Sequence, residues 1–329
     1  MAARRAPVIL DAMGGDHGPD RTVPGALAAC REHGVPVILV GRADEIHRRL
    51  RRHGASGEVE VRHADDAVPM TERGGRTAFR RTSSLMVGCE LARQEGLPFV
   101  SAGPTGAVVA CAVRALGRRE GVRRPALAVA LPTLSGSTVL IDAGGTADPT
   151  AEMLAQFATL GAAYARDVLG VRDPSVGLLS IGAEPGKGNR LVRDAARLLP
   201  DLPVRFHGNV EGDDVLAGTV DVVVTDGFTG NIVLKNIEGC VRTVLGLAAD
   251  AGIADSGPLE EVARLYAADT HGGAALLGLT GTVVVAHGSS SPAAIARACA
   301  VASDLAAGQA PAPVHGSRLN GRRASGRGG

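Results

Sequence analysis

The chain has 329 residues with 45% hydrophobic and 21% charged side chains, which excludes a wholly disordered protein and allows one large or two ordinary domains. The 35 basic and 34 acidic residues leave a formal net charge of +1, and aromatic residues make up 2%, so neither bulk nucleic-acid binding nor base stacking is indicated. The five cysteines are widely spaced and form no Cys-x-x-Cys pair, which favours a cytoplasmic protein with reduced thiols. No apolar run approaches the roughly 18 residues of a membrane span, which favours a soluble protein.

Nine short apolar runs, each ending in a glycine or polar cluster, predict the strands of one α/β sheet. In chain order they cover residues 7–12, 35–41, 58–64, 98–103, 126–132, 137–143, 175–182, 221–227 and 282–288. Their near-continuous apolarity indicates mostly parallel strands with helices on both faces. The loop between the runs at 126 and 137 is too short for a helix, so it predicts a hairpin and a mixed sheet.

Amphipathic stretches between these runs predict the helices, at residues 21–33, 77–95, 105–116, 151–169, 190–199, 231–251 and 292–307. No proline- or serine-rich linker interrupts residues 1–307, which favours a single α/β catalytic domain, possibly of two lobes. Residues 308–329 combine Pro, Gly, Ser and Arg without periodicity and are predicted to be a disordered basic tail.

The loops that follow the strands are glycine-rich and polar, and in doubly wound sheets ligands bind beyond the carboxyl ends of the strands. These loops read DAMGGDHGPD, SAGPTGA, DAGGT, IGAEPGKGN, GNVEG, TDGFTGN and AHGSSS. A glycine turn that leads into a helix presents free backbone N–H groups to an anion. We therefore expect several of these loops to meet at one edge of the sheet and to cradle an oxyanion.

Lysine is confined to two of these places. The 35 basic residues include only two lysines, Lys187 in GKGN and Lys235 one helical turn after TDGFTGN. A compact ammonium group on a flexible stem suits phosphate or a developing oxyanion, although an ordinary surface lysine is the alternative for each. The histidines His17 and His287 also lie in strand-end loops, where a group titrating near neutrality serves as an acid or a base.

Familiar nucleotide and nucleophile motifs are absent. GAEPGKG has the wrong spacing for a Walker loop, no strand leads into G-x-G-x-x-G, and HGSSS lacks the G-x-S-x-G pattern. Ser289 and its neighbours are therefore interpreted as helix caps and hydroxyl donors. The strand-end acids, such as Asp11 and Asp226, have no metal-ligand spacing, and ordering of loops is their default interpretation, so no metal is expected.

The run of motifs LDAMGGDHGPD, SAGPTGA, GLLSIGAEPGKGN, HGNVEGDDVLAGTVDVVVTDGFTGNIVLKNIEG and LLGLTGTVVVAHGSSS resembles the bacterial acyl-carrier-protein:phosphate acyltransferase family over roughly residues 7–303. The resemblance implies an isocitrate/isopropylmalate-dehydrogenase-like sheet, a cytosolic homodimer, possible peripheral membrane contact and no cofactor. It also implies transfer of a fatty acyl group from the thioester of acyl carrier protein to inorganic phosphate, which forms acyl phosphate for phospholipid synthesis.

Phosphate and a thioester need little acid or base catalysis, so the hypothesis for the site is one of positioning and oxyanion stabilisation. Lys187 and the amides of GKGN and TDGFTGN would hold phosphate, while His17 or an asparagine would polarise the thioester carbonyl. The catalytic candidates are His17, Lys187, Asn189 and Asn231. The substrate-binding candidates are Asp11, Gly14, Gly15, Asp16, Gly103, Thr105, Gly106, Gly186, Gly188, Asn209, Asp226, Gly227, Thr229, Gly230, Lys235, His287, Gly288 and Ser289.

Three loops depart from the family pattern. Pro104 stands where the family has Asn, Arg80-Arg81-Thr82-Ser83-Ser84 where it has K-K-D-S-S, and Asp142 to Thr146 read DAGGT in place of a DVGAN-like loop. These changes keep other interpretations open: an acyl-CoA:phosphate transferase, a catalytically weakened paralogue that binds acyl carrier protein, or a nicotinamide- and metal-dependent decarboxylating dehydrogenase on the same sheet. The missing dinucleotide motif disfavours the last of these.

Overall fold

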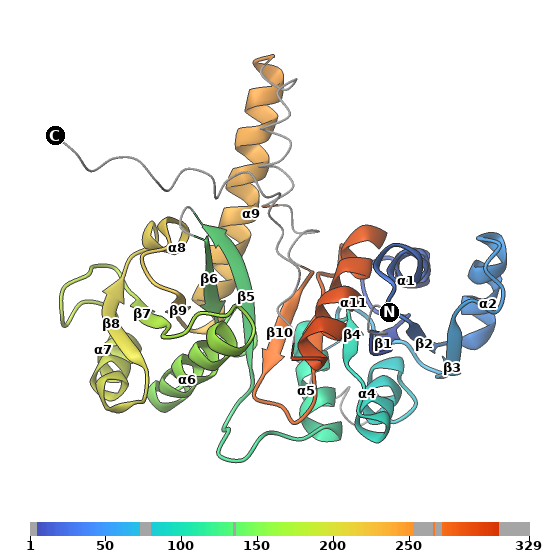
Figure 1. The fold of residues 1–329 in the computed structure, drawn as a ribbon, viewed down its shortest axis with the longest axis horizontal. Coiled ribbons are helices and arrows are strands. Elements are labelled where there is room, and N and C mark those ends of the chain that lie inside the picture. The colour runs from blue at the N-terminus through green and yellow to red at the C-terminus, as the bar shows by residue number, and fades with distance from the viewer. Residues whose placement is uncertain (1–4, 73–79, 134–135, 253–265, 267–271, 309–329) are drawn as a thin grey trace.

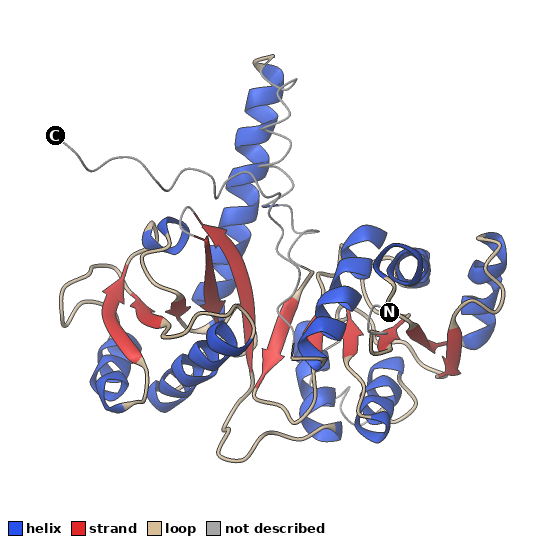
Figure 2. Ribbon diagram, in the orientation of Figure 1, coloured by secondary structure: helices blue, strands red, loops and turns tan. Residues whose placement is uncertain are grey.

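The computed structural model describes residues 5–72, 80–133, 136–252, 266 and 272–308. One sheet of eleven strands runs through the molecule, in the order β3-β2-β1-β4-β11-β10-β5-β6-β9-β7-β8 (Figure 1). The strands form the centre and the helices flank them (Figure 2). The predicted mixed, mostly parallel sheet with helices on both faces is confirmed.

The first half of the sheet consists of five parallel strands. They are β1 (Val8–Asp11), β2 (Val37–Gly41), β3 (Glu60–His63), β4 (Phe99–Ser101) and β11 (Val283–Val285). β1, β2, β4 and β11 are buried along their whole length, as expected of parallel strands covered on both faces. The charged strand β3 forms the edge.

In the second half every strand except β5 runs in the opposite direction. β10 (Ala274–Leu277) is antiparallel to both β11 and β5 (Ala126–Thr133), and β5 is antiparallel to β6 (Gly136–Ile141). β6 is then parallel to β9 (Val222–Val224), β7 (Ser175–Leu179) and β8 (Arg205–Val210). The carboxyl ends of β1, β4 and β11 therefore lie at the edge of the sheet opposite to those of β6, β7 and β9.

Helices cover both faces. One face carries α4 (Ser84–Glu95), α5 (Thr105–Ala115), the short α8 (Asp214–Ala217) and the first turns of α9 (Gly227–Asp250), which pack on a single apolar cluster. The other face carries α1 (Pro19–His33), α2 (Ala43–Arg52) and α11 (Pro292–Ala306) over the first half, and α6 (Ala151–Asp167) and α7 (Arg190–Leu198) over the second. α7 runs directly into a short 3-10 turn (Leu199–Asp201).

All nine predicted strands and the predicted hairpin are present, and two strands were missed. β8 has the polar sequence RFHGNV because it forms the exposed edge, and β10 has only the short run AALL. The helix α2 was also missed, since only Ile46 and Leu50 of its ten residues are buried and the rest is charged.

The helix predicted at residues 77–95 needs correction. α4 begins at Ser84, and the Ser83 hydroxyl caps it by accepting a hydrogen bond from the Met86 amide. Residues 80–83 precede the helix, while 77–79 lie outside the described residues. α9 begins at Gly227, four residues before the prediction, because the Asp226 carboxylate caps it. The predicted tail lies outside the described residues from 309 onward.

No helix in the described part of the chain is both long enough and apolar enough to cross a membrane.

Candidate active site

A cavity of about 340 Å³, here called the central cavity, lies between α5 and α9 on the face of the sheet where its two halves meet. Seven of the predicted site residues line it: Asp16, Gly103, Thr105, Asn231, Lys235, His287 and Gly288. Its apolar part comes from the centre of the sheet and from α9: Leu127, Val129, Ala143, Leu234, Ala274 and Val285. Polar loops thus border a space whose floor is aliphatic.

Asp11 orders the loops at one end of this cavity from a fully buried position. Its carboxylate accepts hydrogen bonds from the Met13 amide at 3.1 Å and from the Ser101 hydroxyl at 2.8 Å, and Ser101 in turn accepts from the Gly103 amide at 2.9 Å. Burial raises the pKa of Asp11, and the hydrogen bond from Ser101 opposes the increase. Asp11 therefore joins the loops after β1 and β4, which is the loop-ordering role given as its default interpretation and not the substrate contact for which it was also a candidate.

Gly14 lies at the same junction, where a side chain has no room. A Cβ atom on Gly14 would lie 2.7 Å from the Asp11 carboxylate and 2.8 Å from the Gly103 nitrogen. Gly15 has a φ of 92°, and a Cβ there would approach the Gly288 carbonyl to 2.9 Å. These glycines let the loops after β1, β4 and β11 pack against one another, with the Asp16 amide donating to the Gly288 carbonyl at 2.8 Å.

The structure places His287 at the central cavity, whereas His17 is exposed and is not among the described residues that line it. The Nδ1 atom of His287 accepts a hydrogen bond from the Ser289 amide at 3.2 Å and lies 2.7 Å from the Ser289 hydroxyl. In the neutral ring this places the proton on Nε2. Ser289 thus orients the imidazole of His287.

At the other end of the cavity, the Asp142 carboxylate organises the DAGGT loop. It accepts backbone hydrogen bonds from Leu127, Gly144, Gly145 and Thr146 at 2.6–3.3 Å. Burial raises the pKa of Asp142, and these amide donors oppose the increase. The altered loop therefore keeps a well-defined conformation in this chain.

The helix α9 begins in contact with that loop. A Cβ on Gly230 would lie 2.0 Å from the Asp142 carbonyl oxygen, and one on Gly227 would lie 2.7 Å from the Thr146 carbonyl oxygen. The Asp226 carboxylate accepts from both the amide and the hydroxyl of Thr229 at 2.8 Å. These four residues of the TDGFTGN motif, predicted to bind substrate, fix the start of α9 in this structure.

Asn231 and Lys235 are the predicted site residues that α9 brings to the central cavity, together with Leu234 and Glu238. Asn231 and Lys235 are four residues apart and so occupy one face of the helix. The Asn231 side chain lies beside Gly144, at 3.6 Å from the position of a Cβ on that glycine. The ammonium group of Lys235 forms an ion pair with Glu238 at 3.1 Å, and Glu238 also lines the cavity.

The loop of Lys187 lies outside the central cavity. Because β7 is parallel to β6 and β9, this loop shares an edge of the sheet with the DAGGT loop and the start of α9, opposite to the loops after β1, β4 and β11. Gly188 and Asn189 line a separate cavity of about 420 Å³, here called the α7 cavity, together with Asp226 and Thr229. Lys187 is exposed between Gly186 and Gly188, which have φ values of 89° and 96°. The expected meeting of loops at one edge is found for those after β1, β4 and β11, but the loop of Lys187 does not join them, and the start of α9 lies between the two cavities.

The asparagines of this region have structural partners. The Asn189 side chain caps α7 by accepting from the Val192 amide at 2.9 Å, and the Asn209 side chain donates to the Glu184 carbonyl at 3.1 Å. Both therefore order the loop that carries Lys187. Gly106, the last of the predicted residues, belongs to a third cavity along α5.

The departures from the family pattern are also accommodated locally. Pro104 is the first flanking residue of α5, and its carbonyl accepts from the amides of Ala107 and Val108. Thr82 donates its hydroxyl to Asp66 at 2.6 Å, and Arg80 pairs with Glu72 at 3.4 Å.

Sequence reasoning missed the residues from the middle of strands, such as Leu127 and Val129, because their apolar pattern predicts only core. It also missed Met70 and Glu238. The position of Glu238, three residues after Lys235 on a helix, was a signal that could have found it. Across the residues that the structure describes, no group of three or more His, Cys, Asp or Glu is arranged to hold a metal ion.

Phosphate acyltransferases of other bacteria are similar to this chain over most of its length. The chain is 48% identical over 318 residues to the phosphate acyltransferase of Thermobifida fusca, covering 92% of this chain and 88% of that protein. It is 42% identical over 313 residues to the phosphate acyltransferase of Acidobacterium capsulatum, covering 91% of this chain and 93% of the other.

Solved structures share the fold at low sequence identity. A phosphotransacetylase from Streptococcus pyogenes matches with a TM-score of 0.63 at 18% identity, over 92% of this chain and 94% of that one. A 4-hydroxythreonine-4-phosphate dehydrogenase from Klebsiella pneumoniae matches with a TM-score of 0.55 at 16% identity, over 93% and 99%. Residues 6–312 match the sequence profile of one family, and the chain therefore belongs to the family described as fatty acid synthesis protein.

Proposed function

We propose that this chain is a phosphate acyltransferase that moves a fatty acyl group from the thioester of acyl carrier protein to inorganic phosphate, forming acyl phosphate for phospholipid synthesis. Two relatives at 48% and 42% identity carry the name phosphate acyltransferase. The observation that carries the proposal is the central cavity, where an aliphatic floor suited to an acyl chain meets the polar groups of Thr105, Asn231 and His287.

The chemistry needs few groups. Phosphate has a second ionisation near that of phosphate esters, about 6, and is already nucleophilic at neutral pH. The thiolate that leaves has an ordinary pKa of about 8.5. A phosphate oxygen attacks the thioester carbon, the new C–O bond forms, and the C–S bond breaks as the tetrahedral oxyanion collapses. The protein has to position the two reactants and to stabilise that oxyanion, for which one well-placed donor contributes roughly 3–4 kcal/mol.

Asn231 is the donor that we assign to the oxyanion, in place of His17. Its side-chain amide lines the central cavity from the start of α9, opposite the first residue of α5, Thr105. The backbone N–H groups at the start of α5 have no side-chain cap among the described residues, so they supply further donors on the same side. Lys235, balanced by Glu238, adds positive charge one turn along α9.

Lys187 is proposed to bring inorganic phosphate to the other side of the same helix start. Its loop contains two glycines in left-handed conformation and ends at Asn189, beside Thr229 in the α7 cavity. Thr229 and Asn231 are two residues apart on α9, so the two cavities are neighbours along one helical turn. An exposed ammonium group on a flexible stem suits capture of a mobile anion.

The outer part of α9, which includes Val244 and Leu247, is proposed as the surface for a homodimer contact and for a peripheral membrane contact. Among its 24 residues only Gly227 and Gly230 are buried, although its composition is apolar. Val244 and Leu247 are 62% and 63% exposed on the part that projects from the body of the protein (Figure 1). An exposed apolar helix of this length needs a partner surface, and the same face of a second copy meets that need.

The test is mass spectrometry for acyl phosphate after the protein is mixed with acyl-carrier-protein thioester and inorganic phosphate. Asn231→Ala should lower kcat about 10²-fold, as expected for loss of one oxyanion donor. Asn236→Ala is the matched control, because Asn236 lies on the same helix outside the central cavity, and its kcat should stay near that of the unmodified protein.

Absence of acyl phosphate with every donor would refute the function. A product formed from acyl-CoA but not from the carrier-protein thioester would replace the donor while leaving the reaction in place. Equal kcat for Asn231→Ala and Asn236→Ala would remove Asn231 from its role.

A further inference from the structure

A third cavity, of about 490 Å³, runs along α5 and is called here the α5 groove. One wall consists of Gly106, Val109, Ala110 and Val113, which are spaced as i, i+3, i+4 and i+7 and so share one face of the helix. At 1.5 Å per residue this wall is about 10 Å long. The groove is also lined by Arg118, Arg123 and Arg124, and the Arg124 guanidinium donates to the Thr146 hydroxyl at 3.2 Å, beside Gly145. The groove therefore combines an aliphatic helix wall with three guanidinium groups.

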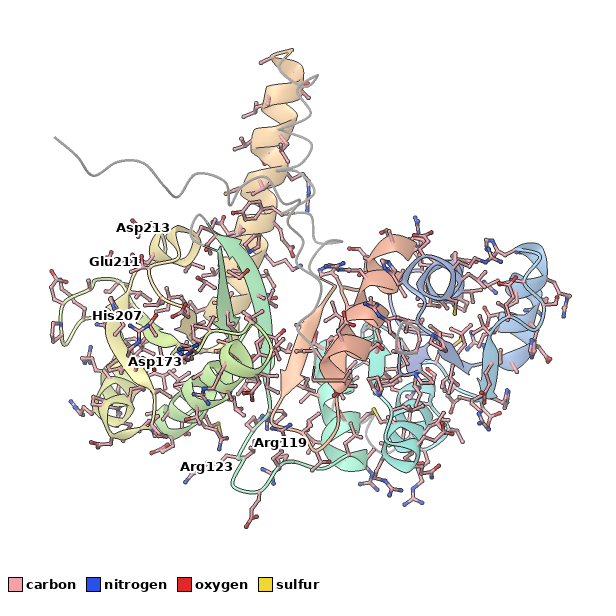
Figure 3. All side chains as sticks on the ribbon, viewed as in Figure 1. Arg119, Arg123, Asp173, His207, Glu211 and Asp213 are labelled. Atoms are coloured by element: carbon pink, nitrogen blue, oxygen red, sulfur yellow. The ribbon has the colours of Figure 1, made fainter. Side chains whose placement is uncertain are left out.

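The backbone beneath the arginines is firmly held. The Gln156 side chain accepts from the amides of Arg123 and Arg124 at 2.8 and 3.4 Å, and it donates to the Gly121 carbonyl at 2.8 Å. Arg119 donates to the Leu279 carbonyl at 3.0 Å, which ties the connection between α5 and β5 to the one between β10 and β11. Figure 3 shows Arg119 and Arg123 on this connection.

The positive charge of this connection is not neutralised within the described part of the chain. Residues 118–124 contain four arginines and one glutamate, Glu120. Arg118, Arg123 and Arg124 form no ion pair with any described carboxylate, and the Arg123 guanidinium donates no hydrogen bond to a described residue. Glu152 is an exposed acid whose pKa is lowered mainly by a hydrogen bond with Thr150 and, to a smaller extent, by the positive charge of Arg123. Three guanidinium groups around one cavity favour an anion there, and their planar donors match the oxygens of a phosphate ester.

The α5 groove begins where the central cavity ends. Thr105 lines the central cavity and the next residue, Gly106, lines the groove. The same holds at the DAGGT loop, where Ala143 lines the central cavity and Gly145 lines the groove. Two separate segments thus pass from one space to the other, so a single extended ligand has room to occupy both.

We propose that the α5 groove binds the phosphopantetheine arm of the acyl donor, with the arm's phosphate at Arg118, Arg123 and Arg124. This inference rests on the proposed function, which places the thioester in the central cavity. The arm is a chain of about a dozen bonds, roughly 15 Å when extended, and it carries two neutral amides between the sulfur and the phosphate. Its length exceeds the roughly 10 Å of the helix wall.

Acyl carrier protein and coenzyme A both carry this arm, and pantetheine carries it without the phosphate. The experiment therefore compares decanoyl thioesters of acyl carrier protein, coenzyme A and pantetheine as donors for Arg123→Gln. We expect kcat/KM to fall about tenfold for the first two donors, the loss typical of one charge-assisted hydrogen bond, and to stay within about twofold for decanoyl-pantetheine. Arg48→Gln is the matched control, since Arg48 is exposed on α2 and lines none of the three cavities.

An equal loss with all three donors would overturn the assignment, because decanoyl-pantetheine has no phosphate to lose. A loss confined to the carrier-protein donor would also overturn it and would point to contact with the protein surface of the carrier. Unchanged kcat/KM with every donor would refute a role for Arg123 while leaving the transferase activity intact.

Calorimetry separates this inference from the function on which it rests. The unmodified protein should bind 4′-phosphopantetheine more tightly than pantetheine, and Arg123→Gln should abolish the difference. If no donor yields acyl phosphate but this difference in affinity is found, the proposed function fails and the groove assignment stands. If both ligands bind equally to the unmodified protein, the groove assignment fails.

Discussion

Gly230→Ala tests whether the start of α9 is fixed by direct backbone contact with the DAGGT loop. In the structure a Cβ atom on Gly230 would lie 2.0 Å from the carbonyl oxygen of Asp142 and 3.0 Å from its carbonyl carbon. Since real Cβ contacts essentially never fall below 3.0 Å, the helix and the loop must separate by about 1 Å. Neither side yields easily, because four backbone amides hold the Asp142 side chain in the same loop.

The expected cost follows from two opposing terms. Overpacking of this severity costs about 3 kcal/mol, whereas alanine in place of glycine within a helix gains about 1 kcal/mol. The free energy of unfolding should therefore fall by about 2 kcal/mol. Asn231 follows directly in the chain and moves with the helix, so kcat should fall about 10²-fold, as a misplacement near 1 Å produces.

Gly239→Ala supplies the control, because Gly239 lies in the same helix and a Cβ there meets nothing within 4 Å. This variant should gain up to about 1 kcal/mol and keep its activity. Urea unfolding and acyl-phosphate formation are measured for both variants at one protein concentration. If Gly230→Ala matches Gly239→Ala in both measurements, the contact between α9 and the DAGGT loop does not set the geometry of the site.

Four further predictions concern other parts of the molecule. Lys187→Ala should raise the KM for phosphate about tenfold without changing the KM for the acyl donor, and near-normal kinetics would remove Lys187 from the phosphate path. Burial raises the pKa of Asp11 above 3.8, so the stability that its protonated carboxyl contributes is fully present below pH 3.8 and is lost as the pH rises through the folded pKa. In urea unfolding between about pH 4 and 7, Asp11→Asn should lack this dependence of the free energy of unfolding on pH. Parallel plots of that free energy against pH for the two proteins would contradict the prediction. Leu247→Asp should yield monomers in sedimentation without loss of helix content, and an unchanged mass would argue against the α9 interface. In the native protein iodoacetamide should alkylate the exposed Cys240 well before Cys89, whose pKa burial raises well above its usual value, and mass spectrometry of the peptides would reveal the opposite order.

Much of the fold was predictable because the buried strands keep unbroken apolar runs. β1, β6 and β9 pack against helices on both faces, so their sequences carry no polar alternation. β8 and β10 escaped prediction because an edge strand and a run of alanine and leucine lack that signature. The helix α2 escaped for a related reason: it covers the sheet with two side chains, Ile46 and Leu50.

The site was predictable in its parts and not in its assembly. Asn231, Lys235 and His287 were identified from strand-end loops, and they meet in one cavity. Lys187 was expected beside them, yet its loop ends in the separate α7 cavity, on the other side of the start of α9. The pairing partners of a strand depend on long-range contacts that no local pattern encodes, so this separation had no signal in the sequence.

The glycines of TDGFTGN illustrate the same limit. A glycine before a helix suggests an anion site, but Gly227 and Gly230 face carbonyl oxygens of the DAGGT loop. Only glycine fits at these two positions because the DAGGT loop, some 80 residues away in the chain and so roughly half a domain length distant, packs directly against them.

The length of α9 has a mechanical consequence. Its 24 residues span about 36 Å, while the fixed contacts lie at its first turn. If the helix pivots at Gly230 as a rigid rod, a displacement of about 3 Å at its tip, about 30 Å away, shifts Lys235 by about 0.8 Å, since that residue lies about 7.5 Å from the pivot. A surface that binds the far end of α9 therefore changes the geometry of the residues near its start, so the turnover rate depends on what the end of the helix contacts.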